Sequence, residues 1–328
     1  MKDLVLDIKN VGLIKEASIK INGLTVIAGE NDTGKSTVGK SLFYINHTLK
    51  STVGKTVDII GKNIGFFAKP SNSYFEDIFD FPCSGIKISF NGNQDDFADS
   101  DFKSYVDNAF YTTFIETPIV TNLFHLFSNL DTIQNDIPFK INYPYTLRVL
   151  YKQLKLELKD ETDLNKIEFI DYLKNIMDGE FISHSLKEII FKRNNQEFGI
   201  NSVAMGIKNF GILQLLIKNN YLTKDSILIV DEPEVHLHPK WQLAYAKFIV
   251  ELVKNGVKVL ITSHSPYMVE AFELYSKKES INANFYLANK KDNYSIIEDV
   301  GDDLEPIYKK LAEPINELEE LLEELDVK

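Results

Sequence analysis

The first thirty residues have the alternating pattern of apolar and polar side chains that is typical of β-strands. Residues 4–9 alternate with a period of two, and after a turn at 10–12 the alternation resumes over 14–21. This pattern predicts an antiparallel hairpin. Residues 24–28 follow as a short, mainly apolar run with β-branched side chains, which is typical of a central buried strand.

The rest of the chain changes between helical and strand patterns. Residues 36–49 have apolar positions at helical spacing, and the apolar runs at 227–230 and 257–262 predict two more buried strands. Helical spacing also occurs in the middle of the chain, at 122–133, 145–158 and 163–177. Asn-containing turns predict two further hairpins, at 91–93 and 194–195. We therefore expect an α/β fold with a mixed β-sheet core, an N-terminal antiparallel hairpin lobe and a helical insertion.

The chain is acidic, with 36 Lys and Arg residues against 48 Asp and Glu residues and a formal net charge of -12. This balance disfavours general coating of nucleic acid, because such coating needs cations to neutralise phosphates. Ten of the acids lie with three lysines in residues 302–328. The remainder is only mildly acidic, so a local basic groove and a nucleic-acid partner stay open.

Cysteine content and hydropathy restrict the cellular setting. Cys83 is the only cysteine, which excludes a disulfide framework and a thiolate zinc site. The N-terminus, MKDLVLDIKN, contains acids where a secretory signal has a continuous apolar run. No apolar stretch approaches the ~18 residues that a membrane-spanning helix needs. We expect a cytoplasmic protein without a membrane partner.

The octapeptide GENDTGKS lies between a predicted strand and a predicted helix, the context that a phosphate-binding loop requires. Its glycines permit close approach of the backbone to a phosphate. The amides that follow lie at a helix N-terminus, whose positive end favours an anion. Lys35 would reach the β- and γ-phosphates, and the Ser36 hydroxyl would bind Mg²⁺. The expected nucleotide-binding residues here are Gly29, Asn31, Thr33, Gly34, Lys35, Ser36 and Thr37.

Acidic and imidazole side chains follow the two apolar runs of the second half. In SILIVDEPEVHLHP, we assign Asp231 to Mg²⁺ and Glu232 to activation of the attacking water. In VKVLITSHSP, His264 comes directly after the strand. Because ligands of an open parallel sheet bind beyond the carboxyl ends of its strands, His264 would hydrogen-bond the γ-phosphate or the water. The expected catalytic residues are Lys35, Glu232 and His264.

GENDTGKS, SILIVDEPEVHLHP and LITSHSP, in this order, resemble the ATPase heads of the ABC/SMC superfamily. The Glu-Pro-Glu run closing in Leu-His-Pro and the opening hairpin resemble in particular stand-alone AAA-type ATPases of the OLD-like branch (overcoming lysogenization defect). The motifs extend from Gly29 to Pro266. The resemblance implies a P-loop NTPase fold of the ABC-ATPase type, ATP and Mg²⁺ as cofactors, and a homodimer or higher oligomer that sandwiches ATP.

Two further motifs of these ATPases have counterparts here. FIETP resembles the segment with the Q-loop role and would bring Glu116 near the metal or the attacking water; an ordinary loop after a strand is the alternative. NSVAMGIKNFG has the position of the signature motif, where Gly206 would contact the γ-phosphate bound to the opposite subunit. Met205 replaces the usual serine, with Ser202 or Asn209 as candidate substitutes. This departure predicts slow ATP turnover or assembly held by ATP.

His236 and His238 suggest a metal site, but the sequence offers no third ligand nearby. The turn that contains them matches the family's turn after the catalytic carboxylate, which contributes to the dimer interface in relatives. The middle of the chain has no heptads sustained long enough for an SMC-like coiled-coil arm. A helical lobe is therefore the expected form of the insertion.

The C-terminal segment repeats apolar residues at alternating steps of four and three, with acids between them, as in a narrow helical seam. We expect Pro314 to start or kink this helix. We expect the helix either to pack on its own domain or to form a seam for another subunit or partner. We expect the chain to lack the Toprim nuclease domain of OLD proteins. The predicted division is 1–118 and 186–300 for the ATPase head, 119–185 for the insertion, and 301–328 for the acidic helix.

Three functional interpretations remain. The first is a dimerising ATPase switch; by resemblance, short ATPases without a Toprim domain work with a separately encoded nuclease or toxin in phage defence, so the chain would gate such an effector. The second is an SMC- or RecF-like repair ATPase that clamps DNA. The third is a nucleotide-dependent scaffold with little hydrolysis, which Glu232 opposes and Met205 leaves open. The signature segment disfavours a transporter ATPase.

Overall fold

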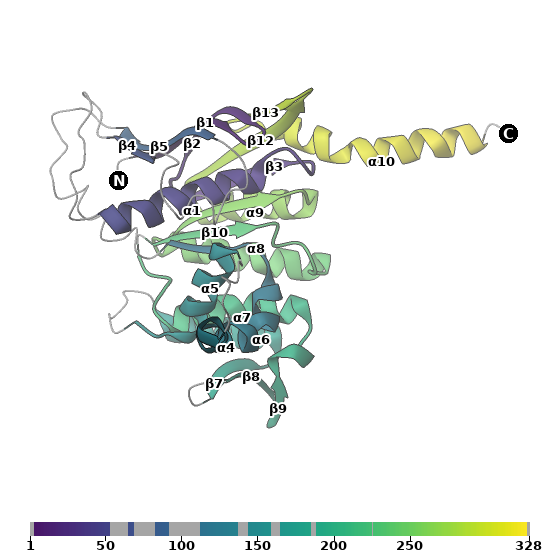
Figure 1. Ribbon diagram of the computed structural model, residues 1–328. Helices are drawn as coiled ribbons and strands as arrows, with labels where there is room; N and C mark the ends of the chain where they lie inside the picture. Colours follow the sequence, from purple (N-terminus) through teal and green to yellow (C-terminus); the bar gives the residue numbers. More distant parts are fainter. Residues whose placement is uncertain are drawn as a thin grey trace.

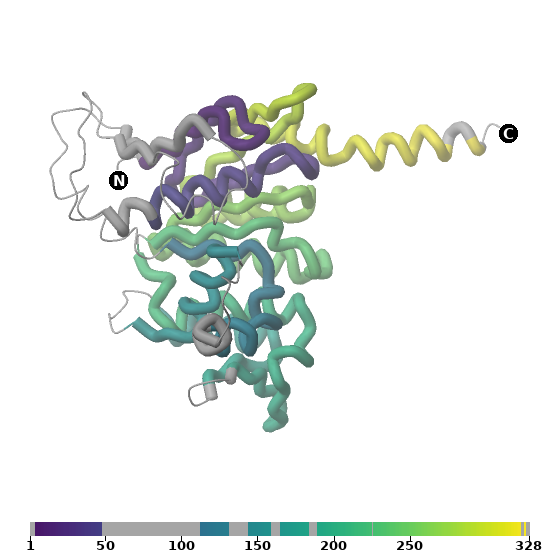
Figure 2. Tube along the Cα trace, in the orientation of Figure 1, coloured from purple at the N-terminus to yellow at the C-terminus, as the bar shows by residue number. Residues whose placement is uncertain are grey.

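The computed structural model describes residues 3–52, 65–68, 83–91, 112–136, 144–158, 165–184, 188–224 and 226–326 (Figure 1), and Figure 2 traces the chain in the same orientation. The strands are β1 (Asp3–Val11), β2 (Ile14–Lys20), β3 (Leu24–Gly29), β4 (Gly65–Ala68), β5 (Cys83–Asn91), β6 (Thr112–Ile115), β7 (Glu180–His184), β8 (Glu188–Arg193), β9 (Gln196–Gly199), β10 (Ile227–Asp231), β11 (Lys258–Ser263), β12 (Ala283–Lys291) and β13 (Tyr294–Asp299). The α-helices are α1 (Lys35–Thr52), α4 (Phe124–Asp136), α5 (Tyr145–Lys155), α6 (Lys166–Met177), α7 (Met205–Lys218), α8 (Pro239–Lys254), α9 (Pro266–Glu279) and α10 (Glu305–Asp326), and two 3₁₀ helices are η2 (Pro118–Leu123) and η3 (Ile200–Ser202).

A mixed sheet forms the centre of the molecule. Within the described ranges its strand order is β4-β5-β1-β2-β13-β12-β3-β11-β10-β6. β12, β3, β11, β10 and β6 run parallel to one another. β1 pairs antiparallel with β2 and with β5, and β5 with β4, so one edge of the sheet is an antiparallel lobe. The predicted mixed core and N-terminal hairpin are both confirmed.

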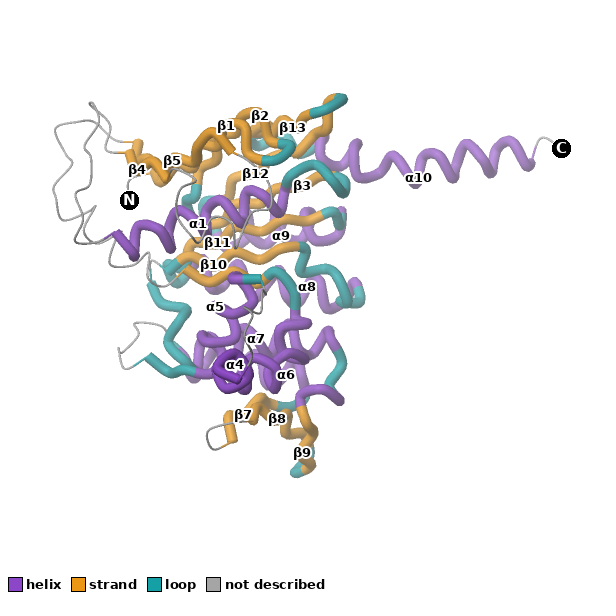
Figure 3. Tube along the Cα trace, in the orientation of Figure 1, coloured by secondary structure: helices purple, strands orange, loops and turns teal. Residues whose placement is uncertain are grey.

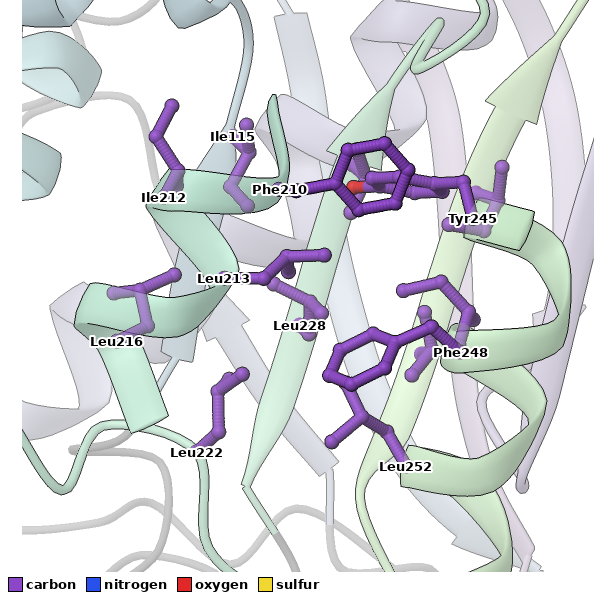
Figure 4. Close-up of a cluster of buried hydrophobic side chains, with 14 of the residues drawn as sticks. Ile115, Phe210, Ile212, Leu213, Leu216, Leu222, Leu228, Tyr245, Phe248 and Leu252 are labelled. Carbon is purple, nitrogen blue, oxygen red and sulfur yellow. The ribbon is translucent and has the colours of Figure 1, made fainter. Parts of the chain in front are cut away.

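The parallel strands are buried on both faces, which explains their nearly unbroken apolar sequences. Successive side chains of a strand point to opposite faces. Leu228 and Val230 of β10 therefore enter the core shared with α7, α8 and α9, while Ile229 enters the core under α1. Figure 4 shows part of the first core, where Leu213 of α7 and Phe248 of α8 point toward Leu228.

Helices α4, α5, α6 and α7 lie together beyond the β6 edge of the sheet, with the small β7-β8-β9 sheet at their far end (Figure 3). The predicted helical stretches correspond to η2 with α4, to α5 and to α6, with ends that differ by a few residues. The hairpin predicted around 194–195 joins β8 to β9. The strand before the turn at 91–93 is β5, but the turn itself lies outside the described residues.

Helix α10 begins on the body of the molecule and then projects away from it (Figure 1). Leu304, just before it, and Ile307 are buried in the core with α9. Leu318 and Leu322, further along, are 62% and 60% exposed. Pro314 lies inside the helix rather than at its start. The first turns therefore pack on their own domain, as one of the two alternatives predicted. No described residue covers the distal seam, and a role for it in binding another subunit or partner stays a prediction. Among the described helices, none is both long and apolar enough to cross a membrane.

Candidate nucleotide-binding site

A cavity of about 600 Å³ opens at the carboxyl end of β3, where the predicted phosphate loop joins α1. Residues 31–37 line it along one side, which includes all the predicted binding residues of the loop except Gly29. Gly34 has a φ of +85° and Gly29 a φ of +154°, backbone conformations that side chains disfavour. Gly12 and Leu13 line the cavity from the tip of the β1–β2 hairpin. The hairpin was predicted, but its approach to the loop was not, because that approach depends on the strand order.

Lys35 is the buried cation of this cavity. Its side chain is only 3% exposed, and its Nζ donates a hydrogen bond of 2.5 Å to the main-chain oxygen of Glu30. Nζ also lies 3.5 Å from Oε1 of Glu232, the residue assigned to water activation. Thr33 donates its hydroxyl to the same Glu30 oxygen at 2.8 Å. The phosphate loop therefore binds its own lysine through the Glu30 main-chain oxygen, and the Glu232 carboxylate faces the Lys35 ammonium group.

Asp231 and Ser36 lie together at the end of β10 and the start of α1. Burial raises the pKa of Asp231. Hydrogen bonds that its carboxylate accepts from Thr262 and Ser36 lower the pKa, but burial has the larger effect. A hydroxyl next to a largely buried carboxylate supplies oxygen ligands of the kind that Mg²⁺ prefers. No cluster of three or more His, Cys, Asp or Glu side chains within the described ranges has the arrangement of a metal site on its own. Ser36 and Asp231 would therefore hold Mg²⁺ together with phosphate oxygens.

Glu232 follows β10 in a left-handed conformation, with a φ of 45°. Its N–H donates to the main-chain oxygen and to the hydroxyl of Thr262, each at 3.1 Å. Its side chain is 27% exposed and lies 3.4 Å from Nδ1 of His264. The hydrogen bond with His264, assisted by Lys35, lowers the pKa of Glu232. The same hydrogen bond raises the pKa of His264. The three predicted catalytic residues therefore form one connected group.

Glu234 is a second carboxylate on the same imidazole, and the sequence analysis did not single it out. Its Oε1 accepts from the Ser263 hydroxyl at 2.8 Å and from the His264 N–H at 2.7 Å, and it lies 3.3 Å from His264 Nδ1. The side chain is only 4% exposed. The repeated acid in Asp-Glu-Pro-Glu was the signal that could have identified it.

Glu116 lies away from the cavity lining, between α1 and α5. Its Oε1 is 3.0 Å from Nζ of Lys40, and its Oε2 accepts from the Thr146 hydroxyl at 2.9 Å. Its negative charge nevertheless contributes to raising the pKa of Asp231. A role for Glu116 near the metal stays a prediction, and its visible contacts connect the phosphate-loop helix to α5.

Gly206 lies in the first turn of α7 and packs within its own subunit. A Cβ at this position would lie 3.0 Å from the main-chain oxygen of His236 and 3.1 Å from the Trp241 ring. Of the two candidate substitutes for the signature serine, Ser202 is exposed, whereas Asn209 is buried and donates to the Val235 oxygen at 3.4 Å. The contact of Gly206 with a second subunit stays a prediction.

The two histidines of the turn after β10 have different positions. His238 is the N-cap of α8, and its Nδ1 accepts from the Lys240 N–H at 3.3 Å. His236 has a φ of 70° and is exposed. His238 therefore has a visible structural role at the start of α8.

Comparison with known proteins shows the family to which this chain belongs. The family model described as "AAA domain, putative AbiEii toxin, Type IV TA system" matches residues 24–270, which contain the phosphate loop, the carboxylates and His264. The head of an Smc protein, solved in complex with the C-winged helix domain of ScpA, covers 93% of this chain and aligns over 98% of its own, with a TM-score of 0.50 at 13% identity. This likeness shows the fold, a mixed-sheet α/β fold of the SMC-head type.

Two curated proteins are similar over shorter segments. The uncharacterized protein MJ1542 of Methanocaldococcus jannaschii is 25% identical over 43% of this chain and 17% of its own length. The Septu protein PtuA of Bacillus thuringiensis is 29% identical over 26% of this chain and 24% of its own length. The chain thus spans less than a quarter of either relative. Because the family model covers three quarters of the sequence, the chain belongs to this AAA-domain family.

Proposed function

We propose that the protein is an ATP-binding and ATP-hydrolysing switch that dimerises around the nucleotide. The observation that carries this proposal is the connected group of Lys35, Glu232 and His264 at the mouth of the phosphate-loop cavity. A carboxylate that lies 3.5 Å from a buried lysine and 3.4 Å from an imidazole matches the needs of phosphoryl transfer to water. The family membership and the fold support the same activity.

The residues present fit ATP and Mg²⁺. The loop amides and Lys35 would bind the β- and γ-phosphates, and Ser36 and Asp231 would hold Mg²⁺, which supplies positive charge against the phosphate oxygens. Glu232 would accept a proton from the attacking water. Its lowered pKa keeps the carboxylate ionised at neutral pH and free to accept, while making it a weaker base. His264 would donate a hydrogen bond to the γ-phosphate. On ATP binding, the Lys35 ammonium group would leave the main-chain oxygen of Glu30 and bind the phosphates instead.

We propose that the switch acts on a separate effector, such as a nuclease or toxin, in phage defence. The motif resemblance to OLD-like ATPases and the similarity to Septu protein PtuA support this assignment. The distal half of α10 is the contact surface that we assign to the effector. Residues 313–326 contain seven acids, no lysine or arginine, and exposed apolar side chains at Ile315, Leu318, Leu321, Leu322 and Leu325. Its complement is an apolar helix flanked by basic residues, since a second acidic helix would be repelled.

Three variants test the ATPase assignment. Lys35→Ala removes a charged hydrogen-bond donor, worth about 1.5–3 kcal/mol, so ATP affinity should fall about 10- to 100-fold. Glu232→Gln should bind ATP normally but hydrolyse it about 10²–10⁴-fold more slowly. Glu180→Gln, which changes an ion-paired carboxylate on β7, serves as the matched control. Unchanged ATP binding in Lys35→Ala would refute the proposal.

Native mass of the Glu232→Gln protein, with and without ATP and Mg²⁺, tests the dimer. An ATP-dependent doubling supports the switch, and the Lys35→Ala protein should stay at its original mass. A mass indifferent to ATP, together with ATP-independent binding of duplex DNA, would favour the DNA-clamp alternative instead. ATP binding without turnover in the wild type would favour the scaffold.

A further inference from the structure

Glu234 connects the turn after β10 to the turn after β11. One oxygen, Oε1, accepts the Ser263 hydroxyl and the His264 N–H, and it lies 3.3 Å from His264 Nδ1. Ser263 in turn accepts the Ser265 N–H at 3.1 Å, at the start of α9. The backbone and the ring of His264 are therefore both fixed from the same carboxylate oxygen.

This arrangement is not the one that stability alone would favour. Oε2 of Glu234 is buried and has no hydrogen-bond partner among the described residues. A buried polar atom without a partner costs about 1–3 kcal/mol, and burial correspondingly raises the pKa of Glu234. A carboxylate retained at such a cost, against the imidazole of the proposed site, suggests a role in that site.

We infer that Glu234 is the positioning residue for His264: it fixes the ring beside Glu232 and keeps a proton on Nδ1. This inference rests on the proposed ATPase function. With carboxylate oxygens 3.3 and 3.4 Å away, Nδ1 acts as a donor. Nε2 is then the ring atom left to meet a phosphate oxygen or water. Glu232 alone cannot fix the ring in this way, because accepting a proton from water would weaken its hold on Nδ1.

The charged surroundings of the imidazole are few. Glu232 from the end of β10, Glu234 from the following turn and Lys35 from α1 act on His264. The two carboxylates favour the imidazolium, whereas Lys35 opposes it. Tyr245 of α8 is the additional titratable group near Glu234, and burial raises the pKa of its hydroxyl, so it stays neutral. Removing the charge of Glu234 should therefore make the ring less basic.

Two variants of Glu234 separate positioning from packing. Glu234→Ala removes the acceptor, so kcat for ATP hydrolysis should fall at least about 10-fold, with KM within about twofold, because a misplaced ring affects the reacting geometry more than nucleotide binding. Glu234→Gln keeps an acceptor for Ser263 and the His264 N–H but loses the charge. Its kcat should recover substantially relative to Glu234→Ala, while the imidazole pKa of His264 falls.

The imidazole pKa is read by NMR of protein labelled with [15N]histidine, with His264→Gln to assign the signal and Glu180→Gln as the control. A His264 pKa in Glu234→Gln equal to that of wild type overturns the inference, as does a wild-type kcat in Glu234→Ala. If Glu234→Ala does not fold, the Gln variant decides alone through the pKa. If the wild type does not hydrolyse ATP, the proposed function fails, and the NMR comparison still decides whether Glu234 controls the ring.

Discussion

Three glycines allow the steric demands of the phosphate loop to be measured separately from backbone strain. A Cβ added at Gly29 would lie 2.5 Å from the main-chain oxygen of Ala288 in β12, and its φ of +154° disfavours any side chain. Gly301 has a φ of +58°, but a Cβ there meets nothing within 4 Å. Gly199 has a φ of -60° and equally open surroundings. Substitution by alanine therefore adds backbone strain and a steric collision at Gly29, backbone strain alone at Gly301, and neither at Gly199.

The expected losses follow from these contacts. Gly199→Ala should change the free energy of unfolding by less than about 0.5 kcal/mol. Gly301→Ala should cost about 1–2 kcal/mol, the penalty of a left-handed alanine. Gly29→Ala carries about 1–3 kcal/mol of backbone strain. It also displaces a β12 carbonyl that cannot rotate away, which adds about 1–3 kcal/mol of overpacking. The total loss of unfolding free energy in Gly29→Ala should exceed that in Gly301→Ala by at least about 1 kcal/mol.

Urea unfolding of the three variants measures these losses, and titration with a fluorescent ATP analogue measures binding. Gly29→Ala should weaken ATP binding at least about 10-fold, because the residue directs the chain from β3 into the loop, at a cost of about 1.4 kcal/mol per decade. Gly301→Ala and Gly199→Ala should bind ATP as the wild type does. Equal stability and equal ATP affinity of the Gly29 and Gly301 variants would refute the assigned close approach of β3 to β12.

Three further predictions concern the site and the projecting helix. His264→Gln should lose most stability at low pH, because a raised pKa in the folded protein adds stability that is complete below about pH 6.5 and declines as the pH rises through the folded-state value; metal-free urea midpoints near pH 6 and 8.5 test this, and a difference from wild type that widens with pH contradicts it. Glu116→Gln should lower the free energy of unfolding by less than about 1 kcal/mol, since its pair with Lys40 is partly exposed. It should nevertheless lower kcat for ATP hydrolysis, because it weakens the link between α1 and α5; unchanged steady-state kinetics would exclude a role for that link. Leu318→Ser should change the melting temperature little but abolish binding of a synthetic lysine-flanked amphipathic helix; unaltered peptide binding would remove α10 as the contact surface.

Local pattern predicted the elements well because each depends on neighbouring residues. The α1 helix was expected over 36–49 and extends over Lys35–Thr52, and GENDTGKS has the expected strand and helix on either side. The placement of Gly12 and Leu13 in the cavity was not predictable in the same way. It requires β13 to lie between β2 and β12, a pairing between segments some 280 residues apart in sequence. Periodicity identifies a strand but not its neighbour.

The seam of α10 shows the same limit within a single helix. Its apolar spacing continues unchanged from Leu304 to Leu325, so the sequence gives both halves one pattern. Burial nevertheless separates them, because only the first turns reach α9 and β3. An apolar stripe reports which face of a helix can be covered, and not what covers it. The arrangement in space, and not the sequence, therefore shows that the distal stripe is exposed while the first turns are packed.

Glu232 and Glu234 have the same side chain but different surroundings in the folded protein, which the sequence alone does not show. These identical side chains are two positions apart in the sequence, the spacing that would place them on one face of a strand. The left-handed conformation of Glu232 breaks that relationship at the end of β10. As a result Glu232 faces Lys35 while Glu234 is buried against Ser263, and both reach His264 from different directions. The motif was enough to predict Glu232 as the residue that activates water, and the repeated acid could have marked Glu234 as well. The contact of Glu234 with His264, however, becomes visible only when the turn after β11 is in place.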